Sequence, residues 1–229
     1  MTSGVRLGAA LFNADHSRLG EELARVEAAG LDFVHLDVFD GRFVPDLGFP
    51  PRTIEHLRPL TRLPFEVHLA AEEPLRFLPA LRDAGVDLLL LHVESVSLLY
   101  EAVFSVRDAG LRVGLVFGLG TPLELLPPVA GMLDAVLLLA RVTGEGARGA
   151  SFNPMVIPRV RRARELIDQA EAGVDLQVAG GVRREHVRDL VAAGATSLAL
   201  GGGIYRVPDM GAEVRAIRRA LAGEAVDVG

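Results

Sequence analysis

The sequence contains no cysteine and no tryptophan, and aromatic residues make up only 5% of its 229 positions. Without cysteine there is neither a disulfide framework nor a thiol nucleophile, and we expect a cytoplasmic protein. The N-terminus lacks a basic segment followed by an apolar one, so we expect no signal peptide. No apolar run approaches the ~18 residues of a membrane span, so we expect no membrane partner.

Excess positive charge is also lacking, because the formal net charge is −6 at neutral pH. This acidic balance argues against a nucleic-acid-binding surface. Half of the residues are hydrophobic, so the chain can bury a large core. Its length suits either one α/β barrel or two small domains.

A short pattern recurs along the chain, in which a helix-like segment ends at a glycine and an apolar run of strand length follows. Copies end at glycines 30, 85, 110 and 194, with a shorter copy at Gly173. Glycine is favoured after a helix because it adopts the left-handed conformation at little cost. Repeated helix, glycine and strand predict βα units around a parallel sheet.

The pattern predicts eight strands and eight helices. We expect strands at Arg6–Phe12, Phe33–Asp37, Phe65–Leu69, Leu88–Val93, Arg112–Phe117, Ala135–Ala140, Asp175–Ala179 and Ser197–Leu200. We expect helices at His16–Ala29, Pro51–Leu57, Pro74–Ala84, Ser97–Ala109, Pro122–Ala130, Pro154–Ala172, Arg184–Ala193 and Gly211–Leu221. Because no linker or shift in composition interrupts the series, we predict a single (β/α)8 barrel domain over residues 1–229.

Polar side chains follow several predicted strands, at the end of a barrel where function is located. His35 and Asp37 are two residues apart, which places both side chains on one face of a strand. They could be two metal ligands, a base and its partner, or a buried pair that only stabilises the fold. His68, and His92 beside Glu94, end the next two strands.

Two glycine clusters follow the last two predicted strands. Gly180 and Gly181 form the first cluster, and Gly201, Gly202 and Gly203 form the second. Either cluster alone suits a tight turn. Together they predict a phosphate site, because bare backbone N–H groups after these strands are the usual anion receptors of a (β/α)8 barrel.

With these residues the sequence resembles the ribulose-phosphate 3-epimerases over nearly its whole length. The resemblance is carried by His35-Leu36-Asp37-Val38-Phe39-Asp40-Gly41-Arg42-Phe43-Val44-Pro45, by Val67-His68-Leu69, by Leu91-His92-Val93-Glu94, by Val113-Gly114-Leu115 with Gly120-Thr121-Pro122, and by both glycine clusters. It implies a barrel that moves a proton at C3 of a ketopentose 5-phosphate. It further implies a divalent ion (Zn, Fe, Mn or Co) held by two His and two Asp. The two Asp would act as opposed acid and base. By position, His35, Asp37 and His68 match three ligands, and Asp37 matches one acid–base.

The departures from the family pattern concentrate at the barrel mouth. Ala179 stands where the family has its second catalytic Asp, and alanine can neither bind metal nor carry a proton. Ala10 replaces the usual Ser, and Phe39, Ala70 and Ala140 stand where the family has methionines. The loop from Arg141 to Phe152 also differs. We interpret this pattern as changed chemistry on a retained framework.

The leading hypothesis is a sugar-phosphate epimerase or isomerase that uses a metal-stabilised enediolate, with Asp37 as base. The alternatives are a metal-assisted lyase or decarboxylase on a related phosphate ester, and a non-catalytic sugar-phosphate-binding protein. The substrate skeleton and the oligomeric state stay open, with a homo-oligomer as one option.

Further residues are candidates for contacts with the substrate. Asn13 and Phe39 lie at predicted strand ends, and Glu145 is either a replacement acid–base or a solvated loop residue. Arg141 and Arg148 either hold a second anionic group or pair with surface carboxylates. We expect His92 to lie behind the ligands or in the core, and histidines 16, 56 and 186 to lie at the surface.

Overall fold

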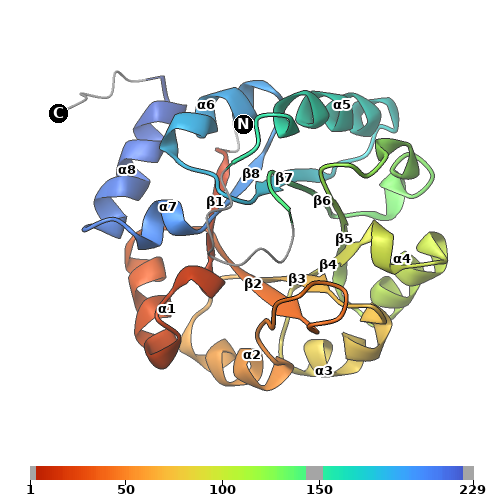
Figure 1. The fold of residues 1–229 in the computed structure, drawn as a ribbon, viewed down its shortest axis with the longest axis horizontal. Coiled ribbons are helices and arrows are strands. Elements are labelled where there is room, and N and C mark those ends of the chain that lie inside the picture. Colours follow the sequence, from red (N-terminus) through yellow and green to blue (C-terminus); the bar gives the residue numbers. More distant parts are fainter. Residues whose placement is uncertain (1–3, 143–151, 224–229) are drawn as a thin grey trace.

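The computed structural model describes residues 4–142 and 152–223. Eight parallel strands pair in sequence order and close into a barrel (Figure 1). They are β1 (Arg6–Ala10), β2 (Phe33–Phe39), β3 (Phe65–Ala70), β4 (Leu88–His92), β5 (Arg112–Phe117), β6 (Ala135–Leu139), β7 (Asp175–Ala179) and β8 (Ser197–Leu200). The predicted (β/α)8 barrel is therefore confirmed.

Helices surround the barrel on its outside (Figure 1). They are α1 (Leu19–Ala28), α2 (Pro51–Leu57), α3 (Leu78–Asp83), α4 (Leu99–Asp108), α5 (Val156–Gln169), α6 (Arg184–Ala192), α7 (Gly202–Tyr205) and α8 (Met210–Leu221). Glycines 30, 85, 110 and 194 have the left-handed backbone expected after a helix, with φ between 77° and 110°. None of the described helices is long and apolar enough to cross a membrane.

The predicted helix at Pro122–Ala130 is wrong. This segment forms only the 3₁₀ turn Leu123–Leu125, followed by a second turn at Ala130–Met132. Pro127 and Pro128 explain the difference, because neither can donate a backbone hydrogen bond and each disfavours helical conformation in the residue before it.

Several other boundaries differ from the sequence prediction. The helix expected from Pro74 begins at Leu78, after a 3₁₀ turn at Pro74–Phe77. The helix expected from His16 begins at Leu19, because Asp15 caps a separate 3₁₀ turn at His16–Arg18. The short helix α7 was not predicted, and it places the second glycine cluster at the start of a helical turn.

The core has two parts. One fills the space between the sheet and the helices, and the other fills the barrel interior with residues such as Phe33, Leu90 and Leu137. Gly8 makes room for the Phe33 ring, since a Cβ at position 8 would lie 2.1 Å from that ring. Apolar side chains therefore fill the middle of the barrel interior, and the polar groups lie towards the ends of the strands.

Candidate active site

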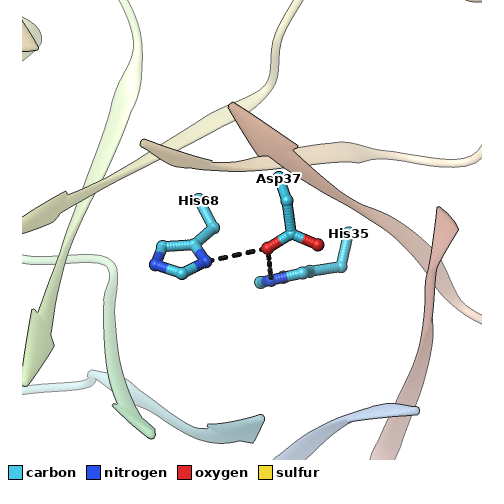
Figure 2. A group of neighbouring side chains, drawn as sticks. All are labelled: His35, Asp37 and His68. Carbon is cyan, nitrogen blue, oxygen red and sulfur yellow. Dashed lines mark hydrogen bonds and ion pairs between the residues drawn. The ribbon is translucent and has the colours of Figure 1, made fainter. Parts of the chain in front are cut away.

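Three side chains meet at the ends of β2 and β3. His35 and Asp37 lie two residues apart on β2, and His68 lies on β3 directly opposite Asp37 in the strand register. Figure 2 shows both imidazole rings turned toward the same carboxylate. The alternation of side chains along a strand brings His35 and Asp37 to one face, and the register adds His68.

The two histidines lie at different distances from Asp37. Nδ1 of His68 lies 2.9 Å from Oδ1 of Asp37, and Nε2 of His35 lies 3.7 Å from the same oxygen. His35 and His68 are almost fully buried, while 14% of the Asp37 side chain is exposed. A carboxylate at the edge of solvent, backed by two buried imidazoles, can be reached by a ligand from the mouth.

The protonation states follow from these surroundings. Burial works to raise the pKa of Asp37, but hydrogen bonding and charge from His35 and His68 outweigh it and hold the pKa well below its usual range. Burial lowers the pKa of His68 to about 4, although its hydrogen bond with Asp37 opposes the change. At neutral pH the site therefore contains an ionised carboxylate and a neutral His68.

The donor set fits a divalent metal ion. One ligand atom from each of His35, Asp37 and His68 lies within 4.8 Å of the other two, and within the described ranges no other group of three potential ligands comes together. Two imidazoles and one carboxylate with open positions suit zinc or iron(II). Nε2 of His35 is the nitrogen that faces Asp37, and its buried Nδ1 has no hydrogen-bond partner among the residues that the structure describes.

Local structure holds the carboxylate in place. The segment after β2 folds back on the strand, and the N–H of Phe49 donates to the backbone carbonyl of Asp37 at 2.8 Å. Gly48 permits this approach, because a Cβ there would lie 2.4 Å from that oxygen. The ring of Phe39 meets His68 edge-on, with centroids 5.5 Å apart, and forms an apolar wall beside the site.

His92 lies behind His68, in agreement with the expectation from the sequence. Its Nε2 lies 2.8 Å from Nε2 of His68, and its Nδ1 lies 2.9 Å from Glu94. Thr121 and Arg159, which were not predicted as site residues, complete the surroundings of Glu94. Thr121 lies in a segment that carries the family resemblance, whereas nothing in the sequence singles out Arg159.

The end of β7 carries an alanine. Ala179 ends β7, which lies across the barrel from β2 (Figure 1). It is buried in the interior cluster together with Leu139 and Ala199. No carboxylate therefore occupies the strand position where the family pattern has its second Asp.

The glycine clusters lie beside other candidate residues. Gly180 and Gly181 both have left-handed backbone, with φ of 100° and 69°. A Cβ on Gly180 would lie 2.8 Å from Cγ of Arg141, and one on Gly201 would lie 2.6 Å from the amide nitrogen of Asn13. The structure thus brings Arg141 to the first cluster and Asn13 to the second.

The remaining candidates have different outcomes. Glu145 and Arg148 lie outside the described residues. His16 and His56 are exposed, as expected. The prediction for His186 needs correction: only 22% of its side chain is exposed, because its ring stacks on Phe152 with centroids 3.8 Å apart.

Comparisons with known proteins agree with this geometry. The model of the Ribulose-phosphate 3 epimerase family matches residues 6–205. Ribulose-phosphate 3-epimerase of Synechocystis is 33% identical over 98% of this chain and 97% of its own length. Ribulose-phosphate 3-epimerase 1 of Cupriavidus necator is 37% identical over 90% of this chain and 86% of its own.

Solved structures at lower identity share only the fold. Phosphoribosyl anthranilate isomerase from Thermus thermophilus superimposes with a TM-score of 0.67 at 18% identity, covering 95% of this chain and 98% of that one. The tryptophan synthase A-subunit from Pyrococcus furiosus gives 0.66 at 18% identity, covering 96% and 98%. The family match, the full-length relatives and the shared barrel lead to one conclusion: the chain belongs to the ribulose-phosphate 3-epimerase family, a family of isomerases.

Proposed function

We propose that this protein is a sugar-phosphate epimerase or isomerase that exchanges a proton on a ketose phosphate through an enediolate. One observation carries the proposal: Nε2 of His35 and Nδ1 of His68 converge on the carboxylate of Asp37 at the barrel mouth. A buried pair that served stability alone would not need a second imidazole on the same oxygen.

His35, Asp37 and His68 would hold the metal. A divalent ion bound there supplies a positive charge that stabilises negative charge on the oxygens of the substrate. The chain orients these ligands before binding, because the two imidazoles are buried and lie on paired strands. Substitution of any of these three residues should therefore weaken binding of the ion, and turnover should fall as a consequence.

Asp37 is the proposed base. Its carboxylate is ionised and partly exposed, so it can accept a proton from a carbon held above the mouth. Because Ala179 lines the facing strand, Asp37 serves one face of a planar enediolate. Proton transfer between C1 and C2, or exchange at C3 with retention, needs only that one face.

The phosphate would lie on the amides of Gly180, Gly181, Gly201, Gly202 and Gly203. Gly180 and Gly181 have left-handed backbone, and a side chain at Gly203 would lie 2.9 Å from the carbonyl of Val182. Asn13, Phe39 and Arg141 border the same mouth and are proposed contacts with the sugar.

Covalent routes do not compete with this proposal. The sequence contains no lysine and no cysteine. The amine needed for a Schiff base and the thiol needed for a thioester or thiohemiacetal are therefore unavailable in the barrel. Proton transfer by a positioned carboxylate requires neither group.

The test is proton exchange in deuterated water. Ribulose 5-phosphate and related ketose phosphates would be incubated with zinc-loaded protein, and deuterium at C1 and C3 would be followed by NMR. We expect exchange that falls by about 10²–10⁴-fold in Asp37→Asn. His68→Ala should lose both the exchange and the bound metal. His56→Ala, which replaces an exposed histidine on α2, should retain the exchange. No exchange by folded, metal-loaded protein with any ketose phosphate would refute the proposal.

A further inference from the structure

A chain of hydrogen bonds leads away from His68 on the side opposite Asp37. Nε2 of His68 lies 2.8 Å from Nε2 of His92, and Nδ1 of His92 lies 2.9 Å from Oε2 of Glu94. The other oxygen of Glu94 accepts from the N–H of Gly118 at 2.9 Å and from the hydroxyl of Thr121. Both histidines are buried, so their ring nitrogens depend on these partners.

The direction of this chain can be deduced from its ends. Glu94 accepts at both oxygens, so His92 must donate through Nδ1–H to the carboxylate. A neutral His92 then has an unprotonated Nε2, and this nitrogen accepts Nε2–H from His68. A neutral His68 that donates through Nε2 has a free lone pair on Nδ1. That lone pair points at Asp37, where the proposed metal would lie.

The opposite direction moves the contact without a hydrogen to the other end of the chain. If His68 donated Nδ1–H to Asp37, its Nε2 would accept from His92, and Nδ1 of a neutral His92 would carry no proton. That nitrogen would face a Glu94 carboxylate at 2.9 Å with no hydrogen between two acceptors. Two neutral rings supply two hydrogens for three contacts, so one contact must lack a hydrogen. When Nδ1 of His68 is unprotonated, that contact is the one with Asp37, where the proposed metal ion would bind the free lone pair. The opposite tautomer leaves no lone pair on Nδ1 for the ion and leaves the contact with Glu94 unsatisfied.

Glu94 is held firmly as a charged acceptor. Burial works to raise its pKa, but hydrogen bonds from His92, Thr121 and Gly118 outweigh burial and lower it to about 2. The segment that supplies two of these donors is itself tied down. One nitrogen of Arg159, on α5, donates to the carbonyls of Gly118 at 3.0 Å and Thr121 at 2.6 Å.

From this arrangement we infer that Glu94, acting through His92, is a positioning residue for the metal ligand His68, and that Thr121 and Arg159 hold Glu94 in place. The inference rests on the metal site of the proposed function. Partners that fix the tautomer of a ligand histidine typically change metal affinity by about 10–100-fold. Glu94 itself does not reach the metal.

The test uses zinc affinity, measured by competition of metal-free protein with a chromophoric chelator. Glu94→Gln replaces one of the two acceptor oxygens with a donor amide, so we expect affinity to fall by about 10–100-fold. Thr121→Val removes one hydroxyl donor and should cause a smaller loss, while Thr121→Ser should restore the wild-type value. Glu101→Gln, an exposed carboxylate on α4, is the matched control and should change nothing.

A second measurement separates positioning from general stability. In zinc-loaded protein with ¹⁵N-labelled histidine, NMR should show His68 protonated on Nε2 and His92 on Nδ1. In Glu94→Gln the resonances of His68 should show a second tautomer. A uniform drop in melting temperature with unchanged tautomers and affinity would indicate a merely structural role and overturn the inference.

The outcomes distinguish the two proposals. If the wild-type protein binds no zinc, the proposed metal site is wrong. The positioning of His68 by Glu94 through His92, called the relay below, is then wrong as well. If the wild type binds zinc and Glu94→Gln binds equally well, the relay alone is overturned. Should Glu94→Gln not fold, the comparison of Thr121→Val with Thr121→Ser decides, because equal affinities in those two would overturn the relay.

Discussion

Residue 179 is one of the positions at which this barrel departs from the pattern of its family. A carboxylate there would face Asp37 across the mouth, because β2 and β7 lie on opposite sides of the barrel. The alanine instead joins Leu139 and Ala199 in the apolar interior. Inversion at C3 needs proton removal on one face and delivery on the other, so this position decides which stereochemistry is accessible.

Ala179→Asp should therefore raise the rate of C3 inversion of ribulose 5-phosphate by about 10²–10⁴-fold, the usual contribution of a positioned acid–base group. Product stereochemistry read by NMR checks this rate. Ala179→Asn is the matched control, because it has the same shape without the ability to carry the proton. Rapid inversion by the unaltered protein would mean that another group has taken this role.

The N-terminus of helix α6 is capped by a histidine side chain. The N–H of Arg183 donates to Nδ1 of His186 at 3.1 Å, so the ring caps the helix. The same ring stacks on Phe152 and thereby ties the segment before α5 to α6. A protonated His186 could not accept this hydrogen bond, and its charge would lie unfavourably at a helix N-terminus.

This cap should make the stability of the protein depend on pH. Burial of the ring and the charge of Arg183 lower the pKa of His186, and Glu185 and Asp189 offset only part of the shift. Below the ordinary histidine pKa of about 6.5, the unfolded chain binds this proton more readily than the folded one, so the free energy of unfolding falls as pH falls.

His186→Gln should reduce that pH dependence, because glutamine accepts the same hydrogen bond without titrating. Urea unfolding between pH 7 and pH 5 measures the slope for both proteins. His56→Gln serves as the control, since His56 is exposed on α2. An equal slope in wild type and His186→Gln would show that the cap does not titrate in this range.

The whole molecule separates a catalytic end from a structural end. At the N-terminal ends of the strands, Arg6 lies 2.9 Å from both Glu66 and Asp175. Gln177 donates to Glu66 at 3.0 Å inside the barrel. Glu66 is only 1% exposed, and its burial raises its pKa although Arg6 opposes the change. This network closes the floor of the barrel, and Glu66 lies opposite His35 in the strand register.

Arg6→Met should destabilise the protein by about 2–4 kcal/mol, because it leaves Glu66 as a buried, uncompensated charge. Urea unfolding measures this change. Arg112→Met provides the control, since the exposed pair of Arg112 with Asp134 should be worth about 1 kcal/mol or less. Zinc affinity of folded Arg6→Met should equal that of the wild type. A loss of affinity would show that the two ends are not independent.

Most of the architecture could be predicted from the sequence, because its signals are local. Glycines after helices and apolar runs of strand length identified all eight strands, with ends within two residues of those observed. The helix predicted at Pro122–Ala130 failed because two prolines inside it outweighed its pattern. The helical starts near His16 and Gly202 depended on caps and turns that residue pattern alone did not resolve.

The sequence by itself determined which residues were candidates for the site, because a His and an Asp two apart on a strand must share a face. Only the tertiary structure decided which nitrogen of His68 faces Asp37, and that His92 and Glu94 lie behind it. Those contacts depend on strand register and side-chain rotamers across three neighbouring strands. Residues far apart in sequence meet only once the barrel has closed, so no local pattern records how they are oriented.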